Sequence, residues 1–288
     1  AARLAVFDPP EVPDLDHARD LIEVISPSAA MTTACARARL TTRTAPEGSY
    51  DAVLVCLGRS RPFTRLRIAQ AVAVLKPGGF VLVDGQKTDG IETALKDCAA
   101  LVGISDSYVK SHGRLFWFQA ESDFADWAGI ADEWPTVDGF HTGPGVFSAD
   151  GIDPGSALLA AHLPRTLAGH GADLGAGWGY LSAGVLRACP AVKSLNLIED
   201  DHRALCSAER NVTDPRAQFT WADVTSYQTK VTLDFVITNP PFHAGRAADP
   251  SLGRAFLTAG AGMLGRPGRL WMVANRHLPY EAHPDRLF

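Results

Sequence analysis

The sequence has few cysteines, and none of them is arranged to hold a metal or to frame a set of disulfides. The 288 residues contain five, scattered along the chain, and no two form a CxxC pair: Cys35, Cys56, Cys98, Cys189 and Cys206. Structural zinc sites and disulfide-rich secreted domains both depend on closely spaced cysteines. We therefore expect a reduced, cytoplasmic protein without a bound metal.

Long apolar runs and an excess of positive charge are also missing. No stretch approaches the roughly 18 apolar residues that span a bilayer, and the first residues, AARLAVFDPPEVPDLD, have no apolar signal-peptide core. The 27 Lys and Arg stand against 32 Asp and Glu, for a net charge of −5. This balance excludes a protein that binds nucleic acid through overall charge, but it leaves room for a local basic patch.

What the sequence does contain is a pattern that occurs twice. In the first half, a predicted strand at 50–58 (YDAVLVCLG) precedes an amphipathic helix pattern and a strand at 80–85 (FVLVDG). In the second half, a strand at 233–241 (LDFVITNPP) precedes a helix pattern and a strand at 269–275 (RLWMVAN). We interpret the chain as an internal duplication of one α/β unit. The alternative is that α/β units resemble one another wherever strands and helices alternate.

The segment between the two copies predicts the domain boundaries. The first copy closes at 105–120 with two antiparallel strands around a His112-Gly113 turn, and an acidic stretch rich in Gly and Pro follows. We expect a first domain, a linker and a second domain at 1–120, 121–138 and 139–288. In the second domain Asp153 is a good N-cap and Pro154 suits the first helical position, so a helix is predicted to begin there.

A Gly-rich turn follows a short predicted strand in the second copy. The segment 171–186 (GADLGAGWGYLSAGVL) carries Asp173, Gly175, Gly177 and Gly179 at every second position. Glycines let the backbone turn tightly and approach a ligand without Cβ clashes. Taken alone, the pattern fits a tight strand-to-helix loop equally well.

Acidic residues end the next two predicted strands. The strand KSLNLIED contains Glu199 near its end, where an acid binds ribose hydroxyls in nucleotide-binding sheets, and the strand AQFTWAD ends in Asp223. Because the carboxyl ends of parallel strands share one crevice, the turn and both acids are expected to face one ligand. The alternative is a pair of solvated strand-end acids, and Asp200 or Asp201 could take the place of Glu199.

The fourth strand of the second copy is stopped by Asn239-Pro240-Pro241-Phe242. The prolines fix φ and remove two N–H donors, so the turn is stiff and its carbonyls point outward. Asn239 Oδ1 and the Pro240 carbonyl can together accept both hydrogens of a planar amine. Phe242 supplies a flat face that can stack on a base. A rigid turn that merely ends a strand is the alternative.

These motifs together resemble class I S-adenosylmethionine-dependent methyltransferases, and NPPF resembles the signature of those that methylate planar amines: adenine N6, guanine N2 or the glutamine side chain. By this resemblance the turn at 175–179, with Asp173 before it, binds the methionine part of the cofactor. Glu199 binds the ribose hydroxyls and Asp223 the adenine amine. Asn239 is expected to contact the cofactor as well, and it orients the substrate amine toward the sulfonium methyl group.

Three segments narrow the resemblance: 143–159 (GPGVFSADGIDPGSALL), 239–245 (NPPFHAG) and 273–281 (VANRHLPYE). They are similar to the two-domain bacterial ribosomal RNA guanine-N2 methyltransferases of the RsmC/RlmG type. The resemblance implies a catalytic C-terminal domain and an N-terminal copy that has lost the cofactor. In that copy, 26–34 (SPSAAMTTA) has no Gly turn and CLG at 56–58 replaces NPP.

Other side chains are candidates for contact with RNA or cofactor. Arg59, Arg61 and Arg65 follow the strand of the first copy that matches the catalytic one, and guanidinium groups there could hold RNA phosphates. An Arg-rich solvated helix face is the alternative. His243 could touch the base or only make a structural hydrogen bond. Phe147 could pack over the cofactor or lie in the core.

The sequence thus predicts an α/β fold of two tandem Rossmann-like methyltransferase domains, the N-terminal one degenerate. The expected activity is methyl transfer from S-adenosyl-L-methionine to guanine N2 in ribosomal RNA, by a monomer that works on the RNA or on a ribosomal subunit without membrane or metal. The alternatives are methylation of another planar amine, in DNA, protein or a small molecule, and a catalytically silent RNA-binding or assembly factor. Because the second copy lacks the closing hairpin of the first, we expect the natural chain to continue past Phe288.

Overall fold

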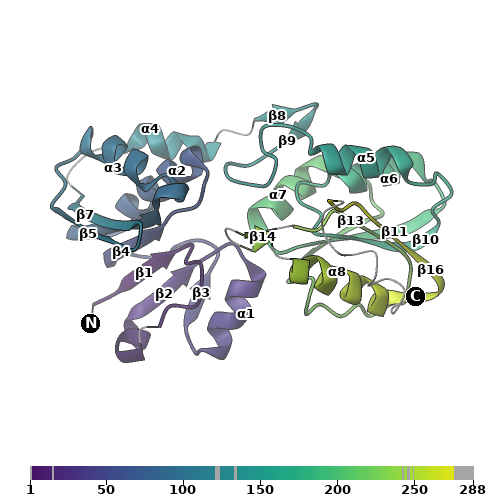
Figure 1. Ribbon diagram of the computed structural model, residues 1–288, viewed down its shortest axis with the longest axis horizontal. Coiled ribbons are helices and arrows are strands. Elements are labelled where there is room, and N and C mark those ends of the chain that lie inside the picture. The colour runs from purple at the N-terminus through teal and green to yellow at the C-terminus, as the bar shows by residue number, and fades with distance from the viewer. Residues whose placement is uncertain are drawn as a thin grey trace. The chain divides into compact units, whose positions relative to one another are not determined.

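The computed structural model describes residues 2–14, 16–120, 124–132, 135–241, 243–244, 247–248 and 250–275. The chain divides into two compact units, Ala1–Trp134 and Pro135–Phe288, and each contains one large sheet (Figure 1). In the described ranges, no helix combines the length and apolarity that a bilayer crossing needs. Within the same ranges, His, Cys, Asp and Glu side chains nowhere gather in a group of three or more that could hold a metal ion.

The first unit has a seven-stranded sheet in the order β3-β2-β1-β4-β5-β7-β6. Its strands are β1 (Leu4–Phe7), β2 (Ile22–Ile25), β3 (Thr41–Arg43), β4 (Tyr50–Cys56), β5 (Leu75–Gln86), β6 (Asp106–Lys110) and β7 (Gly113–Gln119). Strands β1 to β5 are parallel, and β7 runs antiparallel to both β5 and β6. The predicted hairpin is therefore confirmed, although its turn residues are Ser111 and His112, both with positive φ.

Helices cover both faces of this sheet. They are η1 (Asp16–Leu21), α1 (Ala29–Arg37), α2 (Arg61–Ala73), η2 (Lys87–Asp89), α3 (Ile91–Ala99), α4 (Ala125–Ala128) and η3 (Gly129–Asp132). Apolar residues of α2, α3 and α4 share one core with β4, β5 and β7, whereas α1 contributes to a separate cluster with β1 and β2. Each face of the sheet thus has its own apolar layer.

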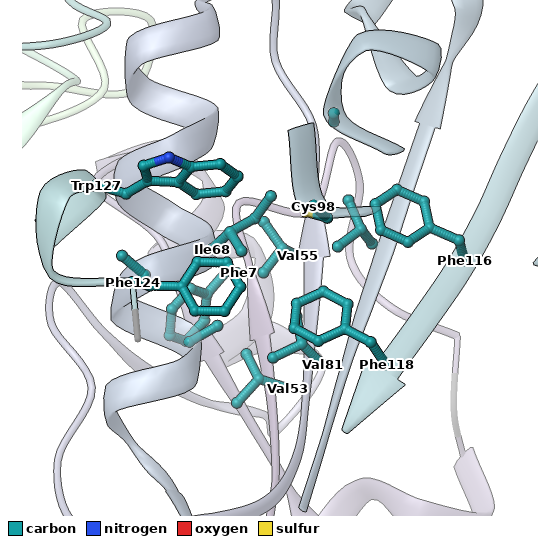
Figure 2. Packing of buried hydrophobic residues seen from close by; sticks show 14 of the residues in the cluster. Phe7, Val53, Val55, Ile68, Val81, Cys98, Phe116, Phe118, Phe124 and Trp127 are labelled. Carbon is teal, nitrogen blue, oxygen red and sulfur yellow. The ribbon is translucent and has the colours of Figure 1, made fainter. Parts of the chain in front are cut away.

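The core of the first unit extends beyond the range predicted for its domain. Figure 2 shows Phe118 next to Phe124, and their ring centroids lie 5.8 Å apart. Phe124 in turn meets the edge of Trp127 at 5.2 Å, and both side chains are buried. Part of the segment expected to be a linker, 121–138, therefore packs into the first unit, because two large aromatic side chains there are buried against β7 and α2.

The second unit has a five-stranded parallel sheet in the order β12-β11-β10-β13-β16. Its strands are β10 (Gly169–Leu174), β11 (Val192–Glu199), β12 (Ala217–Trp221), β13 (Leu233–Thr238) and β16 (Leu264–Met272). Two short hairpins accompany it: β8 (Thr136–Val137) with β9 (Phe140–His141), and β14 (His243–Ala244) with β15 (Ala247–Ala248). The helices are α5 (Pro154–His162), α6 (Tyr180–Ala188), α7 (His202–Asn211) and α8 (Pro250–Met263).

These helices form two layers on the sheet (Figure 1). Apolar side chains of α5, α6 and α7 share one cluster with Leu195 and Phe235 on one face. Side chains of α8 pack with Leu174 and Val236 on the other face. The predicted start of α5 is confirmed, because Asp153 caps the helix by accepting a hydrogen bond from Ser156 N at 2.8 Å.

The five parallel strands of the two sheets follow the same spatial order, and their last strands share an irregularity. Tyr50 pairs with Leu75 and Ala52 with Phe80, while Leu233 pairs with Leu264 and Phe235 with Arg269. In both sheets, four residues of the last parallel strand (76–79 in β5 and 265–268 in β16) therefore lie between two consecutive pairs, where the neighbouring strand has one residue. Pro77-Gly78 lies inside β5, and Pro267-Gly268 lies inside β16. Both strands therefore begin before the predicted positions 80 and 269.

The two sheets differ after their first strand. The second unit has the Gly turn and α6 between β10 and β11, whereas the first unit has Asp8 and the short helix η1 between β1 and β2. The segment that corresponds to the Gly turn therefore follows β1 and is not 26–34, which follows β2 and leads into α1. The sequence did not reveal this because β1 has only four residues, too few to produce a clear strand pattern.

Candidate active site at the strand ends of the second unit

The Gly turn has the backbone conformation that its residue types predict. Gly175, Gly177 and Gly179 have φ values of 70°, 56° and 89°, in the left-handed region that favours glycine. A Cβ at Gly179 would lie 2.8 Å from a methyl group of Val212, whereas one at Gly177 would meet open space. Gly179 is thus required by packing, and the turn faces free volume at Gly177.

Glu199 binds this turn directly. Its Oε2 accepts a hydrogen bond from Gly177 N at 2.7 Å, and its Oε1 accepts one from Asp201 N at 2.8 Å. Burial raises the pKa of Glu199 to about 7, although both hydrogen bonds oppose this rise. Asp201 instead caps α7 and pairs with Arg203 at 2.6 Å. Of these two acids, the one that faces the turn is Glu199.

Asp173 lies beneath the turn and is completely buried. Its Oδ2 accepts a hydrogen bond from Ser182 Oγ of α6 at 2.7 Å. Its Oδ1 has no hydrogen-bond partner among the described residues. Burial raises the pKa of Asp173 to about 7. The observed contacts make Asp173 a support that joins the start of the turn to α6.

Asp223 lies two residues beyond the end of β12. Its carboxylate accepts hydrogen bonds from Thr225 N at 2.8 Å, Thr225 Oγ at 2.7 Å and Ser226 Oγ at 3.2 Å. Strand β12 pairs with β11 so that Trp221 is opposite Glu199. Asp223 therefore belongs to the same edge of the sheet as Glu199, and it stabilises a local turn there.

Asn239 immediately follows the strand that lies beside the Gly turn. Thr238 pairs with Leu174, the last residue before Gly175, and its hydroxyl donates to the Leu174 carbonyl at 2.7 Å. The side-chain Nδ2 of Asn239 donates to Asp153 Oδ2 and to Ser156 Oγ, both at 2.8 Å. A carboxylate can only accept, so the nitrogen must face Asp153 and Oδ1 is the acceptor end.

The remaining residues of the motif are described in part. Pro240 is buried and Pro241 is exposed. Phe242 lies outside the described residues. His243 is described only through its backbone, in β14. The roles predicted for the side chains of Phe242 and His243 remain predictions.

Comparisons with known proteins show the family to which the chain belongs. Residues 138–288 match the model of the methyltransferase small domain family. The ribosomal RNA small subunit methyltransferase C of Pseudomonas paraeruginosa is 34% identical over 253 residues, which cover 85% of this chain and 75% of that protein. The one of Shewanella oneidensis is 33% identical over 248 residues, covering 81% and 70%. The chain belongs to the ribosomal RNA small subunit methyltransferase C family.

A solved structure of the family has the same fold. The T. thermophilus 16S rRNA N2 G1207 methyltransferase (RsmC), in complex with AdoMet and guanosine, superposes with a TM-score of 0.81 at 26% identity. The superposition covers 100% of this chain and 84% of that one. The predicted α/β methyltransferase fold is thus confirmed.

In this methyltransferase small domain, Trp178 ties the Gly turn to the segment before α5, a role that the sequence did not reveal. Its indole N–H donates to the Phe147 carbonyl at 3.1 Å, and its buried ring packs against Phe140 at 5.2 Å and Tyr180 at 5.8 Å. The Phe147 side chain is 68% exposed, so it does not lie in the core. The sequence signal for this role was the presence of a large aromatic residue between Gly177 and Gly179.

Asn211, the last residue of α7, adds a second tie to the same turn. Its Nδ2 donates to the carbonyls of Trp178 and His141, both at 2.8 Å, and its Oδ1 accepts from His141 N at 2.8 Å. The sequence pattern did not reveal this role. Trp178 and Asn211 together fix the position of the Gly turn relative to β9 and the loop that contains Phe147.

The arginines proposed to contact RNA gather in the first unit of this family member. Arg61 and Arg65 both pair with Asp97, at 2.8 Å and 3.0 Å, and the Arg65 guanidinium lies 5.3 Å from the centre of the Trp127 ring. Arg59, Arg61 and Arg65 line a hollow of about 100 Å³. They therefore form a cluster that Asp97 neutralises in part, which differs from a uniformly solvated helix face.

Proposed function

We propose that this chain transfers a methyl group from S-adenosyl-L-methionine to the exocyclic N2 amine of a guanine in ribosomal RNA. The observation that carries the proposal is the Asn239 amide, which is held with its oxygen as acceptor at the strand end beside the Gly turn. Support also comes from the family, since the T. thermophilus relative binds AdoMet and guanosine.

The residues around the turn fit S-adenosylmethionine, which supplies an electrophilic methyl group when bound. Glu199 offers carboxylate oxygens for the ribose hydroxyls beside the open space at Gly177. The amino end of α6 begins at the turn, and its positive end favours the carboxylate of the methionine part. Asp223, at the same sheet edge, accepts from the adenine amine in addition to its bonds to Thr225 and Ser226. Asp173 contributes by supporting the turn.

The chain's own contribution to the reaction is positioning. Asn239 Oδ1 and the Pro240 carbonyl accept the two hydrogens of the guanine amine, which directs the nitrogen lone pair at the methyl group. Pro240 and Pro241 keep the acceptors in place because their φ angles are fixed. As the C–N bond formed and the C–S bond broke, the sulfonium would leave as the neutral thioether S-adenosylhomocysteine, and the methylated amine would release its extra proton to water. No strong base would be required beforehand, and orientation would supply most of the rate. Phe242 stacks on the base, which must be unpaired or flipped out to reach the site.

For the first unit we propose a degenerate copy of the second that grips RNA. The shared strand order and shared irregularity of the last strand support duplication. By register, Cys56 takes the place of Asn239, and burial raises its pKa to about 12, so the thiol stays protonated. No glycine follows β1 in residues 8–14, so this copy has no Gly turn for a cofactor.

The domains would divide close to 134, and Arg59, Arg61 and Arg65 would hold RNA phosphates.

The decisive test is mass-spectrometric mapping of ribosomal RNA from a strain that lacks the protein. We expect one N2-methylguanosine to be missing and to be restored when purified protein and S-adenosylmethionine are added to the RNA or to the ribosomal subunit. Labelled methyl groups that enter DNA or protein would instead identify another planar amine as substrate. Binding of S-adenosylhomocysteine without turnover on any RNA would indicate a catalytically silent factor. We also propose, from the family resemblance, a cytoplasmic monomer.

A further inference from the structure

We propose that Asp153 and Ser156, in the first turn of α5, are positioning residues for the methyl-acceptor site. This inference rests on the proposed function of Asn239. The contacts join residues 83 and 86 positions apart in the chain: Asn239 Nδ2 donates to Ser156 Oγ and to Asp153 Oδ2, both at 2.8 Å. The two hydrogens of Nδ2 are thus both engaged, and the opposite end of the amide presents Oδ1.

The negative charge of Asp153 favours this orientation of the Asn239 amide over the flipped one. If the amide turned over, Oδ1 would face a carboxylate oxygen and a hydroxyl, and two lone-pair-bearing oxygens would oppose each other across a hydrogen-bond distance. In addition, donation of Nδ2–H to an anionic acceptor polarises the amide and increases the negative charge on Oδ1. Asp153 therefore both selects the rotamer of Asn239 and strengthens it as an acceptor for the substrate amine.

The carboxylate of Asp153 is itself held in place. The same Oδ2 that accepts from Asn239 also accepts from Ser156 N at 2.8 Å. A Cβ at Gly155 would lie 2.9 Å from this oxygen and 3.6 Å from both methyl groups of Val273. The absence of a side chain at 155 therefore leaves the space that Oδ2 occupies, and the Asp153-Pro154-Gly155-Ser156 turn is shaped to hold one amide.

The first test compares Asp153→Ala, Asp153→Asn and Ser156→Ala in turnover assays with ribosomal RNA. We expect kcat to fall about 10- to 100-fold in Asp153→Ala, because misplaced reactants lose about this much. Ser156→Ala should lose less, since the charged acceptor Asp153 remains. Asp153→Asn should fall between Asp153→Ala and wild type, because its amide oxygen can still accept from both donors but lacks the charge that fixes the rotamer of Asn239. Affinity for S-adenosylhomocysteine and KM for RNA should stay near wild-type values in all three.

Ser28→Ala provides the matched control for losing a helix cap. Ser28 caps α1 in the first unit by accepting from Met31 N at 3.1 Å, so its removal costs a cap without touching Asn239. An Asp153→Ala enzyme that lost no more kcat than Ser28→Ala would overturn the proposal. So would a loss that appears in cofactor affinity or KM and leaves kcat unchanged.

Gly155→Ala distinguishes a positioning role from a stabilising one, because we expect it to lower kcat without lowering the unfolding temperature. Alanine is the better helix former, and the φ of Gly155 lies outside the left-handed region. The variant should therefore unfold at the same temperature as wild type or higher. It should nevertheless lose kcat about threefold to tenfold, because the new Cβ displaces Asp153 Oδ2 by a few tenths of an ångström. Unchanged kcat in a folded Gly155→Ala would contradict the role of Asp153.

A charge exchange tests the direction of the hydrogen bond. Asn239→Asp sets two carboxylates against each other, and we expect it to be nearly inactive. Asp153→Asn combined with Asn239→Asp restores a donor facing an acceptor, because the amide introduced at position 153 can give its N–H to the new carboxylate at position 239. The double variant should therefore be at least about tenfold more active than Asn239→Asp alone. Equal activity of the two would refute a functional contact.

A readout without turnover keeps this inference distinct from the proposed function. In the side-chain amide NMR spectrum, both Nδ2 protons of Asn239 should exchange slowly with solvent, and exchange should accelerate in Asp153→Ala and Ser156→Ala. Slow exchange in a wild-type protein that methylates no guanine would defeat the proposed substrate and leave the positioning contact standing. Fast exchange in a wild-type protein that methylates guanine would defeat the positioning contact and leave the proposed substrate standing.

Discussion

At the scale of single residues, the two carboxyl groups beside the Gly turn respond to pH in the same direction. Burial raises the pKa values of Asp173 and Glu199 to about 7. Between their ordinary values and about 7, the folded chain binds more protons than the unfolded chain. Their contribution to the free energy of unfolding is therefore present at low pH and is lost as the pH rises toward 7. If a cofactor requires the ionised form of Glu199, that form comes at the expense of stability.

This conflict predicts a pH-dependent affinity for the cofactor. If the ribose hydroxyls donate to Glu199, its ionised form must bind more tightly, so the dissociation constant of S-adenosylhomocysteine should fall as the pH rises to about 7 and then level off. Glu199→Gln should weaken binding at pH 8 and flatten the profile. Calorimetry between pH 5.5 and 8.5 would measure both curves. An identical slope in wild type and Glu199→Gln would assign the titration to another group.

Asn239 should control turnover but not cofactor binding. Asn239→Ala removes the acceptor for the substrate amine, and we expect kcat to fall at least about 1000-fold because the amine is no longer oriented. The dissociation constant of S-adenosylhomocysteine should change less than about twofold, since Glu199 and the Gly turn are untouched. Calorimetry and a single-turnover assay measure the two quantities. Equal losses in both would contradict the role proposed for Asn239.

At the scale of elements, the Gly turn is positioned by contacts with three neighbouring segments. Trp178 donates to the Phe147 carbonyl, Asn211 donates to the Trp178 carbonyl, and Glu199 accepts from Gly177 N. The turn is thus fixed by contacts with the loop that contains Phe147, with α7 and with β11, and its geometry does not depend on glycine alone. This accounts for a tryptophan at a position where a small side chain would be the simpler choice.

Trp178→Phe should loosen this arrangement without emptying the core. Phenylalanine keeps most of the aromatic packing with Phe140 and Tyr180 but cannot donate to the Phe147 carbonyl. We expect the free energy of unfolding to fall by about 1 kcal/mol, the typical value of one hydrogen bond. The affinity for S-adenosylhomocysteine should fall severalfold. Denaturant unfolding and calorimetry would check both, with Trp271→Phe in β16 as a control for a partly buried tryptophan elsewhere in the same unit.

Local patterns predicted the elements of the second unit well, and contacts between distant segments were not predictable from them. The Gly turn, the cap at Asp153 and the strand before Asn239 all follow from residue types within a few positions. The bond from Asn239 to Ser156 depends on how α5 packs on the sheet, which no local pattern encodes. Strand β1 was missed because four residues carry too little periodicity. The tie through Trp178 was likewise hidden, since its partner Phe147 is 31 residues away.

At the scale of the whole molecule, RNA binding must overcome a net charge of −5. The cluster around Arg61 supplies local positive charge, because Arg61 and Arg65 share the single acid Asp97 and Arg59 adds a further exposed guanidinium. Binding that depends on such a cluster weakens with salt as counterions compete for the phosphates. The net negative charge of the rest of the chain would weaken the binding of RNA whose shape does not fit this cluster.

Removing two of these arginines tests their contact with RNA. Arg59→Ala with Arg61→Ala should raise the dissociation constant for ribosomal RNA, and the slope of log K against log salt should decrease by about 1 to 2. Affinity for S-adenosylhomocysteine should not change. Arg37→Ala, on the exposed side of α1, is the control for losing an arginine elsewhere in the same unit. A double variant with the wild-type salt slope would show that the phosphates are bound at another place.

The hydrogen bonds that fix Asn239 span more than 80 residues, and this has a consequence for how activity arises during folding. Contacts between remote segments form late, because the entropy of closing the intervening loop must be overcome first. The acceptor amide is consequently aligned only after β13 has entered the sheet beside β10 and α5 has docked. A chain in which β13 and α5 had not yet packed would therefore lack an aligned acceptor amide even with a complete Gly turn.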